Sequence, residues 1–203
     1  MILTSAAPTI GGAARSTSDA VATTAVTAPD APHAALRTQR LSLVPADPAH
    51  AGRIFEILSD WDVGRMLRTM AFPPDRTEID AWLADQPRQR ASGEAYRYAI
   101  LVDERVVGMV YLDAIADGEA NLGYWLGRDA WGLGYAGEAA RAAITLGFDR
   151  LGLHRLRAGH AEDNAASGRL LSKLGFVPLD IVERPSRPRG GTVRQHRYVL
   201  TKT

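Results

Sequence analysis

A turn with three glycines carries the clearest chemical signal in this 203-residue sequence. Gly132, Gly134 and Gly137 follow a strand predicted over residues 120–126 and lead into a predicted helix. Glycine permits positive φ and a close approach of the backbone to a ligand. The first turn of a helix also leaves N–H groups unpaired at the positive end of its dipole. The stretch therefore predicts an anion site, whose usual occupant is a phosphate or pyrophosphate.

The glycine spacing argues against two common phosphate motifs. The run fits G-x-G-x-x-G only loosely, because neither a strand of the right kind nor an acidic residue at ribose distance follows it. It is not a P-loop, since no Gly-Lys-Ser/Thr follows. The alternative interpretation is a turn that merely connects a strand to a helix.

Two polar residues further along the chain form a second constellation. Asn164 and Ser167 lie three residues apart at the predicted start of a helix, and hence on one face of it. Asn and Ser are preferred at helix starts, where they bond their own backbone. On the residues alone, capping is the favoured interpretation and ligand contact is the alternative.

Composition limits the classes of function. The formal net charge is +1, so no global field points to nucleic acid or to an acidic partner. The chain has no cysteine, which excludes disulfides, thiolate metal sites and a cysteine nucleophile, and we expect no metal. No stretch is long and apolar enough to cross a membrane, and a cytoplasmic enzyme fits this composition.

The elements that must position these residues lie in one predicted domain. Residues 1–36 are rich in Ala, Thr, Ser and Pro, so we expect a disordered tail there and a folded domain over residues 37–203. Seven strands are predicted, at residues 36–44, 96–102, 106–113, 120–126, 154–160, 176–182 and 195–201. Helices are predicted near residues 48–58, 77–90, 137–151 and 164–174. This order indicates an α+β fold with a mixed, mostly antiparallel sheet and helices on both faces.

Three stretches resemble one known family. Trp131 to Ala136 (WGLGYA) resembles motif A of the GNAT acyltransferase superfamily, Q/R-x-x-G-x-G/A, with Trp in the first position. The longer string GYWLGRDAWGLGYAGEA is similar to the RimJ/RimL branch of that superfamily. So are the opening LRTQRLSLVPADPAHA and the N-x-x-S…K-L-G-F segment from Asn164 to Phe176. The resemblance covers Leu36 to about Lys202 and implies the GNAT acyl-CoA N-acyltransferase fold.

The resemblance also implies acetyl-CoA as co-substrate. Its pantetheine arm is expected to pair with backbone where the strands at residues 120–126 and 155–160 splay apart, and Asn164 is expected to contact it. A backbone N–H near Trp125 or Leu126 is expected to bind the oxyanion. The residues expected to bind the cofactor are Trp125, Leu126, Trp131, Gly132, Leu133, Gly134, Tyr135, Ala136, Gly137, Asn164 and Ser167.

Attack of an amine on a thioester calls for a base and for an acid beside the leaving thiolate. Many GNAT enzymes place a Tyr as the acid where this chain has Leu171, so Ser167 is expected to donate a hydrogen bond to the sulfur instead. Asn121 stands where the RimJ/RimL branch often carries Glu, and it can orient a water. Glu119 on the same strand face could reach a water chain, with an exposed turn carboxylate as the simpler interpretation. His160 and Glu162 are further candidates for the base.

The sequence therefore predicts an N-acetyltransferase that transfers acetyl to a primary amine by direct attack in a ternary complex. The acceptor is a protein N-terminus, ribosomal or other, or a small amine, and the enzyme is a monomer or homodimer. The alternative is a catalytically silent acyl-CoA-binding module that acts as a sensor or partner. An arginine-rich loop predicted over residues 184–191 could bind an acidic substrate, the CoA 3′-phosphate or nucleic acid, but a solvated face is favoured and nucleic acid is not expected.

Overall fold

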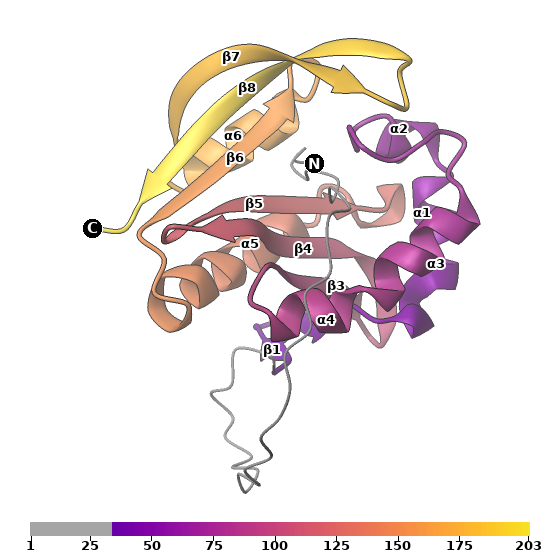
Figure 1. Ribbon diagram of the computed structural model, residues 1–203, viewed down its shortest axis with the longest axis horizontal. Helices are drawn as coiled ribbons and strands as arrows, with labels where there is room; N and C mark the ends of the chain where they lie inside the picture. The colour runs from indigo at the N-terminus through magenta and orange to yellow at the C-terminus, as the bar shows by residue number, and fades with distance from the viewer. Residues whose placement is uncertain (1–33) are drawn as a thin grey trace, which may run out of the picture.

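The computed structural model describes residues 34–203, which form one mixed sheet with helices on both faces (Figure 1). The expected tail of residues 1–36 lies almost wholly outside the described residues. The eight strands lie in the order β1-β2-β3-β4-β5-β6-β8-β7. Only the β5–β6 pair is parallel among the pairs of this sheet. The α+β class and the mostly antiparallel sheet are as predicted.

The strands are β1 (Leu36–Arg37), β2 (Ser42–Pro45), β3 (Tyr96–Val102), β4 (Arg105–Ala116), β5 (Glu119–Leu126), β6 (Arg155–Ala161), β7 (Val177–Ser186) and β8 (Gly191–Thr201). The α-helices are α1 (Ala51–Leu58), α2 (Trp61–Gly64), α3 (Arg76–Ala84), α4 (Gln86–Ala91), α5 (Tyr135–Thr145) and α6 (Ala165–Lys173). A π-helical turn, Leu146–Arg150, extends α5, and short 3-10 turns occur at Pro48–His50 and Arg128–Ala130.

The sheet has eight strands rather than the expected seven because the first predicted strand is a hairpin. A tight turn, in which the N–H of Thr38 donates to the carbonyl of Leu41, separates β1 from β2. Two other hairpins join strands that the sequence predicts at residues 96–102, 106–113 and 120–126. Asp103 and Glu104 join β3 to β4 with positive φ, and Asp117 and Gly118 join β4 to β5 in the same way, as two-residue hairpin turns require.

Three further boundaries differ from the prediction. Helix α3 begins at Arg76 rather than at residue 77, because Asp75 caps it and its carboxylate accepts from the N–H groups of Thr77 and Glu78. Helix α5 begins at Tyr135, two residues before Gly137. The expected arginine-rich loop at residues 184–191 is largely the end of a long β7–β8 hairpin. Pro185 is tolerated there because β7 is an edge strand of the sheet.

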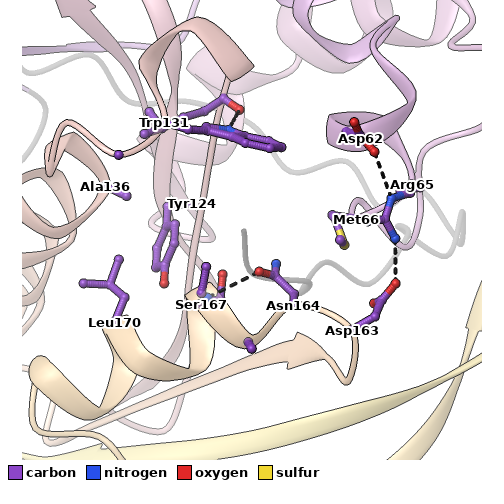
Figure 2. A pocket seen from close by; sticks show the side chains of 14 residues that line it. Asp62, Arg65, Met66, Tyr124, Trp131, Ala136, Asp163, Asn164, Ser167 and Leu170 are labelled. Carbon is purple, nitrogen blue, oxygen red and sulfur yellow. Dashed lines mark hydrogen bonds and ion pairs between the residues drawn. The ribbon is translucent and has the colours of Figure 1, made fainter.

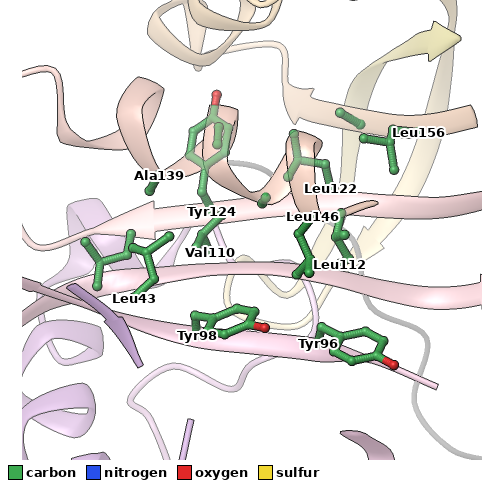
Figure 3. Close-up of a cluster of buried hydrophobic side chains, with 14 of the residues drawn as sticks. Leu43, Tyr96, Tyr98, Val110, Leu112, Leu122, Tyr124, Ala139, Leu146 and Leu156 are labelled. Carbon is green, nitrogen blue, oxygen red and sulfur yellow. The ribbon is translucent and has the colours of Figure 1, made fainter. Parts of the chain in front are cut away.

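Two apolar cores lie on the two faces of the sheet. One core packs β2–β6 against α5 and α6, with Tyr98, Leu122 and Tyr124 among its fully buried side chains (Figure 3). The other packs the opposite face against α1 and α3, with Ile54 and Met109 at its centre. Because side chains alternate along a strand, neighbouring residues of β4 such as Met109 and Val110 face different cores.

The sheet opens between its two parallel strands. β5 and β6 pair at only three positions, Glu119–Asn121 with Arg155–Arg157. Beyond these pairs β6 continues in its ladder with β8, while β5 stays with β4 (Figure 1). The edge of residues 122–126 that faces β6 is therefore outside the β5–β6 ladder. The opening lies where the family resemblance implied a splay between these strands.

Candidate functional site

A pocket of about 570 Å³ lies at the opening between β5 and β6 (Figure 2). Four segments far apart in the sequence meet there: α2, the end of β5, the glycine turn before α5, and the start of α6. Its lining residues are Asp62, Arg65, Met66, Tyr124, Leu126, Trp131, Gly132, Ala136, Asp163, Asn164, Ala165, Ala166, Ser167 and Leu170.

The glycine turn has the backbone geometry of an anion site. Gly134 is the N-cap of α5 with φ +81°, and Gly132 has φ +76°, both in the left-handed region that favours glycine. A Cβ at Gly132 would meet nothing within 4 Å, so the space beside this backbone is open. The unpaired N–H groups at the start of α5 are thus available to an anion.

The flanks of the turn hold it in place. Arg40 donates to the carbonyl of Leu133 at 2.9 Å and pairs with Glu138 at 2.7 Å, which ties the β1–β2 turn to the first turn of α5. The indole Nε1 of Trp131 donates to the carbonyl of Leu126 at 2.9 Å. Of the predicted turn residues, Trp131, Gly132 and Ala136 line the pocket, and Leu126 joins them from β5.

Other residues of the predicted cofactor set lie around the pocket rather than on its lining. Leu133 is exposed, and the Tyr135 ring stacks on the Arg40 guanidinium. Gly137 lies against Leu170, whose Cδ1 would be 3.2 Å from a Cβ added there. The Trp125 side chain points away, into the core under α1 and α3.

Asn164 and Ser167 combine the two roles that the sequence left open. The Asn164 Oδ1 accepts from the backbone N–H of Ser167 at 3.3 Å, so Asn164 is the N-cap of α6. Both side chains also line the pocket while being largely buried (Figure 2). Capping therefore orients the Asn164 amide at the pocket wall instead of competing with a ligand role.

Tyr124 is the functional candidate that the sequence reasoning missed. It lies on β5 with Leu122 and Leu126, and its hydroxyl points into the pocket toward Ser167 (Figure 2). Burial raises the pKa of the phenol, and Ser167 lowers it by a smaller effect. Within residues 34–203, the Oη has no hydrogen-bond partner of ordinary geometry. A buried hydroxyl without such a partner calls for a ligand or another explanation.

The two base candidates of β5 lie on the other side of the opening. The Asn121 Nδ2 is 3.5 Å from Oδ1 of Asp113, a buried carboxylate that Arg97 approaches at 3.2 Å. Glu119 pairs with Arg155 at 2.7 Å and also with Arg157. Neither Asn121 nor Glu119 is among the residues that line the pocket.

The pocket does contain two carboxylates, which the sequence gave no reason to single out. Arg65 bridges them, at 2.6 Å from Asp163 and 3.6 Å from Asp62. Arg189 from the β7–β8 turn also pairs with Asp163 at 3.0 Å. The bonds from Arg189 and Arg65 outweigh the opposing effect of burial and lower the pKa of Asp163. A carboxylate so held is a poor base and instead fixes this wall of the pocket.

His160 and Glu162 are occupied elsewhere. The His160 Nδ1 is 2.8 Å from the carbonyl of Ala161, and its Nε2 is 3.2 Å from the Tyr198 hydroxyl. Burial lowers the pKa of His160, and its ring lies against Gly168 of α6. Glu162 pairs with Arg194 at 2.6 Å. Both side chains thus have structural partners outside the pocket lining.

A protein-family model matches most of the segment that forms this fold and this pocket. A model described as "Acetyltransferase (GNAT) domain" matches residues 40–177. The chain therefore belongs to the GNAT acetyltransferase family. It is 29% identical over 171 residues to the uncharacterised N-acetyltransferase p20 of Bacillus licheniformis, which covers 82% of this chain and 96% of that protein.

Solved structures show the same fold. A RimL ribosomal L7/L12 α-N-protein acetyltransferase in complex with coenzyme A has TM-score 0.71 and 19% identity, covering 81% of this chain and 95% of that one. The microcin C7 self-immunity acetyltransferase MccE, in complex with acetyl-CoA and AMP, has TM-score 0.68 and 16% identity, covering 81% of this chain and 94% of that one.

Among the described residues, no helix is long and apolar enough to span a membrane.

Proposed function

We propose that this chain transfers acetyl from acetyl-CoA to a primary amine by direct attack in a ternary complex. The observation that carries the proposal is the convergence of three groups on one pocket. The glycine turn offers backbone N–H groups, Asn164 offers its amide, and Tyr124 offers a buried hydroxyl beside Ser167. Family membership supplies the reaction class, and two structurally similar proteins were solved with coenzyme A or acetyl-CoA.

The residues present fit acetyl-CoA. The open space at Gly132 and the start of α5 suit a pyrophosphate. The edge of β5 that lies outside the β5–β6 ladder can pair with the amides of a pantetheine arm, and Asn164 can bond it from the other wall. This places the thioester beside Tyr124 and Ser167, with a backbone N–H near Trp125 or Leu126 as oxyanion donor.

Tyr124 is the proposed acid. Its pKa is raised by burial, so the phenol carries its proton at neutral pH and can give it to the thiolate that leaves. Leu171, where many family members carry the acidic Tyr, is buried with no proton to donate. Ser167 donates a hydrogen bond to the same sulfur or to the phenol. Two elements, β5 and α6, thus supply the function that one helical Tyr supplies in those enzymes.

The amine proton leaves on the opposite side of the opening. Asn121 lies at that side, where its amide can orient a water that accepts the proton. Glu119 is held by Arg155 and Arg157, so we assign it to fixing those arginines and not to direct proton transfer. The acceptor, a protein N-terminus or a small amine, would enter here. A cytoplasmic location and a monomeric or dimeric state belong to the same proposal.

The test is turnover across a panel of amines. The panel contains peptides with free N-termini, amino acids and polyamines, and released CoA is detected by its thiol. Acetyl transfer to at least one amine, with acetyl-CoA binding measured separately, supports the proposal. Saturable acetyl-CoA binding with no transfer to any of them would favour the silent CoA-binding module instead.

A further inference from the structure

A second hollow, which we call the arginine groove, lies across β6, β8 and β7 on the face away from α6. Its volume is about 660 Å³, within the range of small-molecule sites. It is lined by Arg68, Asn121, Arg155, Arg157, Ala158, Gly159, Leu179, Arg184, Gln195, Arg197, Tyr198, Val199 and Thr201. Five of these residues are arginines and none is Asp or Glu. The groove is therefore a concentration of positive charge in a chain whose net charge is only +1.

Few carboxylates offset this charge. Glu119 is shared by Arg155 and Arg157. Asp180 pairs with Arg197. Among the described residues, three of the lining arginines thus share two carboxylates, and Arg184 adds a further positive charge. Burial lowers the pKa of Arg68, and the positive charge of Arg184 lowers it further.

The arginines of the hairpin divide into two groups. Arg187 pairs with Glu78 and Arg189 with Asp163, so both tie the β7–β8 turn to segments outside the hairpin. Arg194 pairs with Glu162. Arg184 faces the groove instead, and no ion pair is found for it among the described residues. The arginine groove is therefore distinct from the structural ion pairs at the hairpin tip.

The groove leads to the proposed reaction site. Asn121 lines the groove, and Tyr124, three residues later on β5, lines the pocket. The segment after α2 also contributes to both, since Arg65 and Met66 line the pocket and Arg68 lines the groove. The two hollows thus approach the β5–β6 opening from its two sides, and a molecule in the groove can direct one end toward the thioester.

We propose that the arginine groove binds an anionic part of the acceptor, so that the acceptor is an amine that carries carboxylate or phosphate groups, such as an acidic peptide N-terminus. This inference rests on the proposed acetyl transfer. Guanidinium groups pair bidentately with carboxylate and phosphate. Electrostatic attraction toward a cleft lined by one sign of charge also speeds association and weakens as salt rises.

The experiment compares matched acceptors. One hexapeptide has an N-terminal serine followed by alternating Asp and Glu, and its counterpart carries Asn and Gln. An aminoalkyl phosphate and the corresponding amino alcohol distinguish a small anion from a peptide. Release of CoA gives kcat and KM, and anisotropy of a dye-labelled acidic peptide reports binding without turnover. We expect KM at low salt to be about tenfold lower for the acidic member of a pair, which is the effect of one charge-assisted bond.

Three variants assign the effect to the groove. Arg184→Gln removes one charge and leaves its neighbours' ion pairs intact, and Arg184→Lys retains the charge. Arg37→Gln on β1 is the matched control, because it loses the same charge outside the groove. Arg184→Gln should raise KM for acidic acceptors severalfold and leave neutral ones unchanged, Arg184→Lys should retain part of the preference, and Arg37→Gln should change neither.

The outcomes separate this inference from the proposed function. Equal KM values for acidic and neutral acceptors, with transfer to both, would overturn the groove proposal and leave acetyl transfer standing. Binding of the labelled acidic peptide that depends on Arg184, without transfer to any amine, would support the groove and refute the transfer. A single-stranded oligonucleotide that binds through Arg184 more tightly than the acidic peptide would overturn the proposal in favour of nucleic acid.

Discussion

The pocket and the arginine groove lie on two sides of the same opening, but different chemical groups line them. On the pocket side, backbone geometry and neutral side chains dominate around Gly132, Gly134, Asn164 and Tyr124, while Arg65 pairs with both Asp62 and Asp163. On the groove side, the sheet presents arginines with few carboxylates between them. One side is organised for a molecule held by main-chain bonds and burial, and the other for a molecule held by charge.

With acetyl-CoA in the pocket and the acceptor in the groove, as we propose, this difference would let one fold keep a cofactor and vary an acceptor. Backbone N–H groups at a helix start are fixed by the fold, so the pocket side keeps its chemistry as long as the turn keeps its shape. The groove side depends on which residues occupy outward positions of β6, β7 and β8. Substitution at those positions changes charge without disturbing the ladder, so acceptor preference can change independently of acetyl-CoA binding.

The largest expected effect tests the acid on the pocket side. Tyr124→Phe removes only the hydroxyl, and we expect kcat to fall by about 10²–10⁴-fold, the usual contribution of a general acid. The affinity for acetyl-CoA should be nearly unchanged. Because burial raises the pKa of the phenol, the wild-type rate should show no loss from this group until the pH exceeds 10.

Tyr98→Phe is the matched control for that change. Tyr98 is another buried tyrosine of the same core, and its pKa is raised by burial to about 12. It does not line the pocket, so kcat should stay close to that of the wild type. Equal losses in both variants would show that the effect comes from the core, and Tyr124 would lose its catalytic assignment.

The next effect tests the backbone of the pocket side. Valine at position 134 needs a left-handed φ that β-branched residues rarely adopt, and its Cβ would lie 3.3 Å from Nη2 of Arg40, the side chain that holds the turn. We expect Gly134→Val to weaken CoA affinity by about 100-fold or more, with backbone strain and lost anion contacts both contributing. The measurement is the rise in melting temperature that CoA produces.

Gly93→Val separates the two contributions. Gly93 has φ +75° and open space around it, but it lies after α4, away from the turn. Both variants should lower the melting temperature of the free protein, and only Gly134→Val should lose the stabilisation by CoA. If the Gly134 variant kept its CoA affinity, the pyrophosphate would have to bind elsewhere.

Ser167→Ala should have a smaller effect. Losing one hydrogen bond to a charged sulfur should lower kcat/KM about tenfold. Ser172→Ala on the same helix is the control, because the Ser172 hydroxyl bonds to the carbonyl of Gly168. The measurement is kcat/KM of the two variants under the same conditions. An unchanged value in Ser167→Ala would leave Tyr124 as the only proposed donor to the sulfur.

The smallest effect concerns the buried ion pair behind Asn121. Burial raises the pKa of Asp113 from 3.8 to about 6, against the opposing effect of Arg97. The folded state therefore binds more protons than the unfolded state between about pH 4 and 6, so this group's contribution to stability falls as pH rises through that window. Urea unfolding at several pH values should show this slope in the wild type and not in Asp113→Asn. Asp80→Asn, a surface change, should retain it, and a slope that persists in Asp113→Asn would assign it to another group.

The sequence predicted the backbone features of the pocket side better than the arginine groove. The glycine turn, the Asn164 cap and the two-residue hairpins depend on local backbone preferences, and the structure shows all of them. Tyr124 was missed although strand alternation puts it on the same face as Leu122. Its proposed role depends on which face of β5 packs against α6. Tertiary packing determines that face, and local sequence does not.

The arginine groove could not be predicted from the sequence. Its arginines come from β6, β7, β8 and the segment after α2, and only the strand register brings them together. The sequence shows the arginines of residues 184–191 but predicts a loop there, whereas the β7–β8 hairpin contains most of that segment. Most of its arginines make ion pairs, and Arg184, at its start, faces the groove together with Arg197.

The most direct test of the central claim is a calorimetric titration of the folded protein with coenzyme A and with acetyl-CoA. The proposed binding mode predicts saturable binding of one molecule per chain for each ligand, with a negative heat-capacity change because apolar surface is buried in the pocket. Absence of binding by protein that unfolds cooperatively on heating would contradict it, and the glycine turn would then be a connection between β5 and α5 and nothing more.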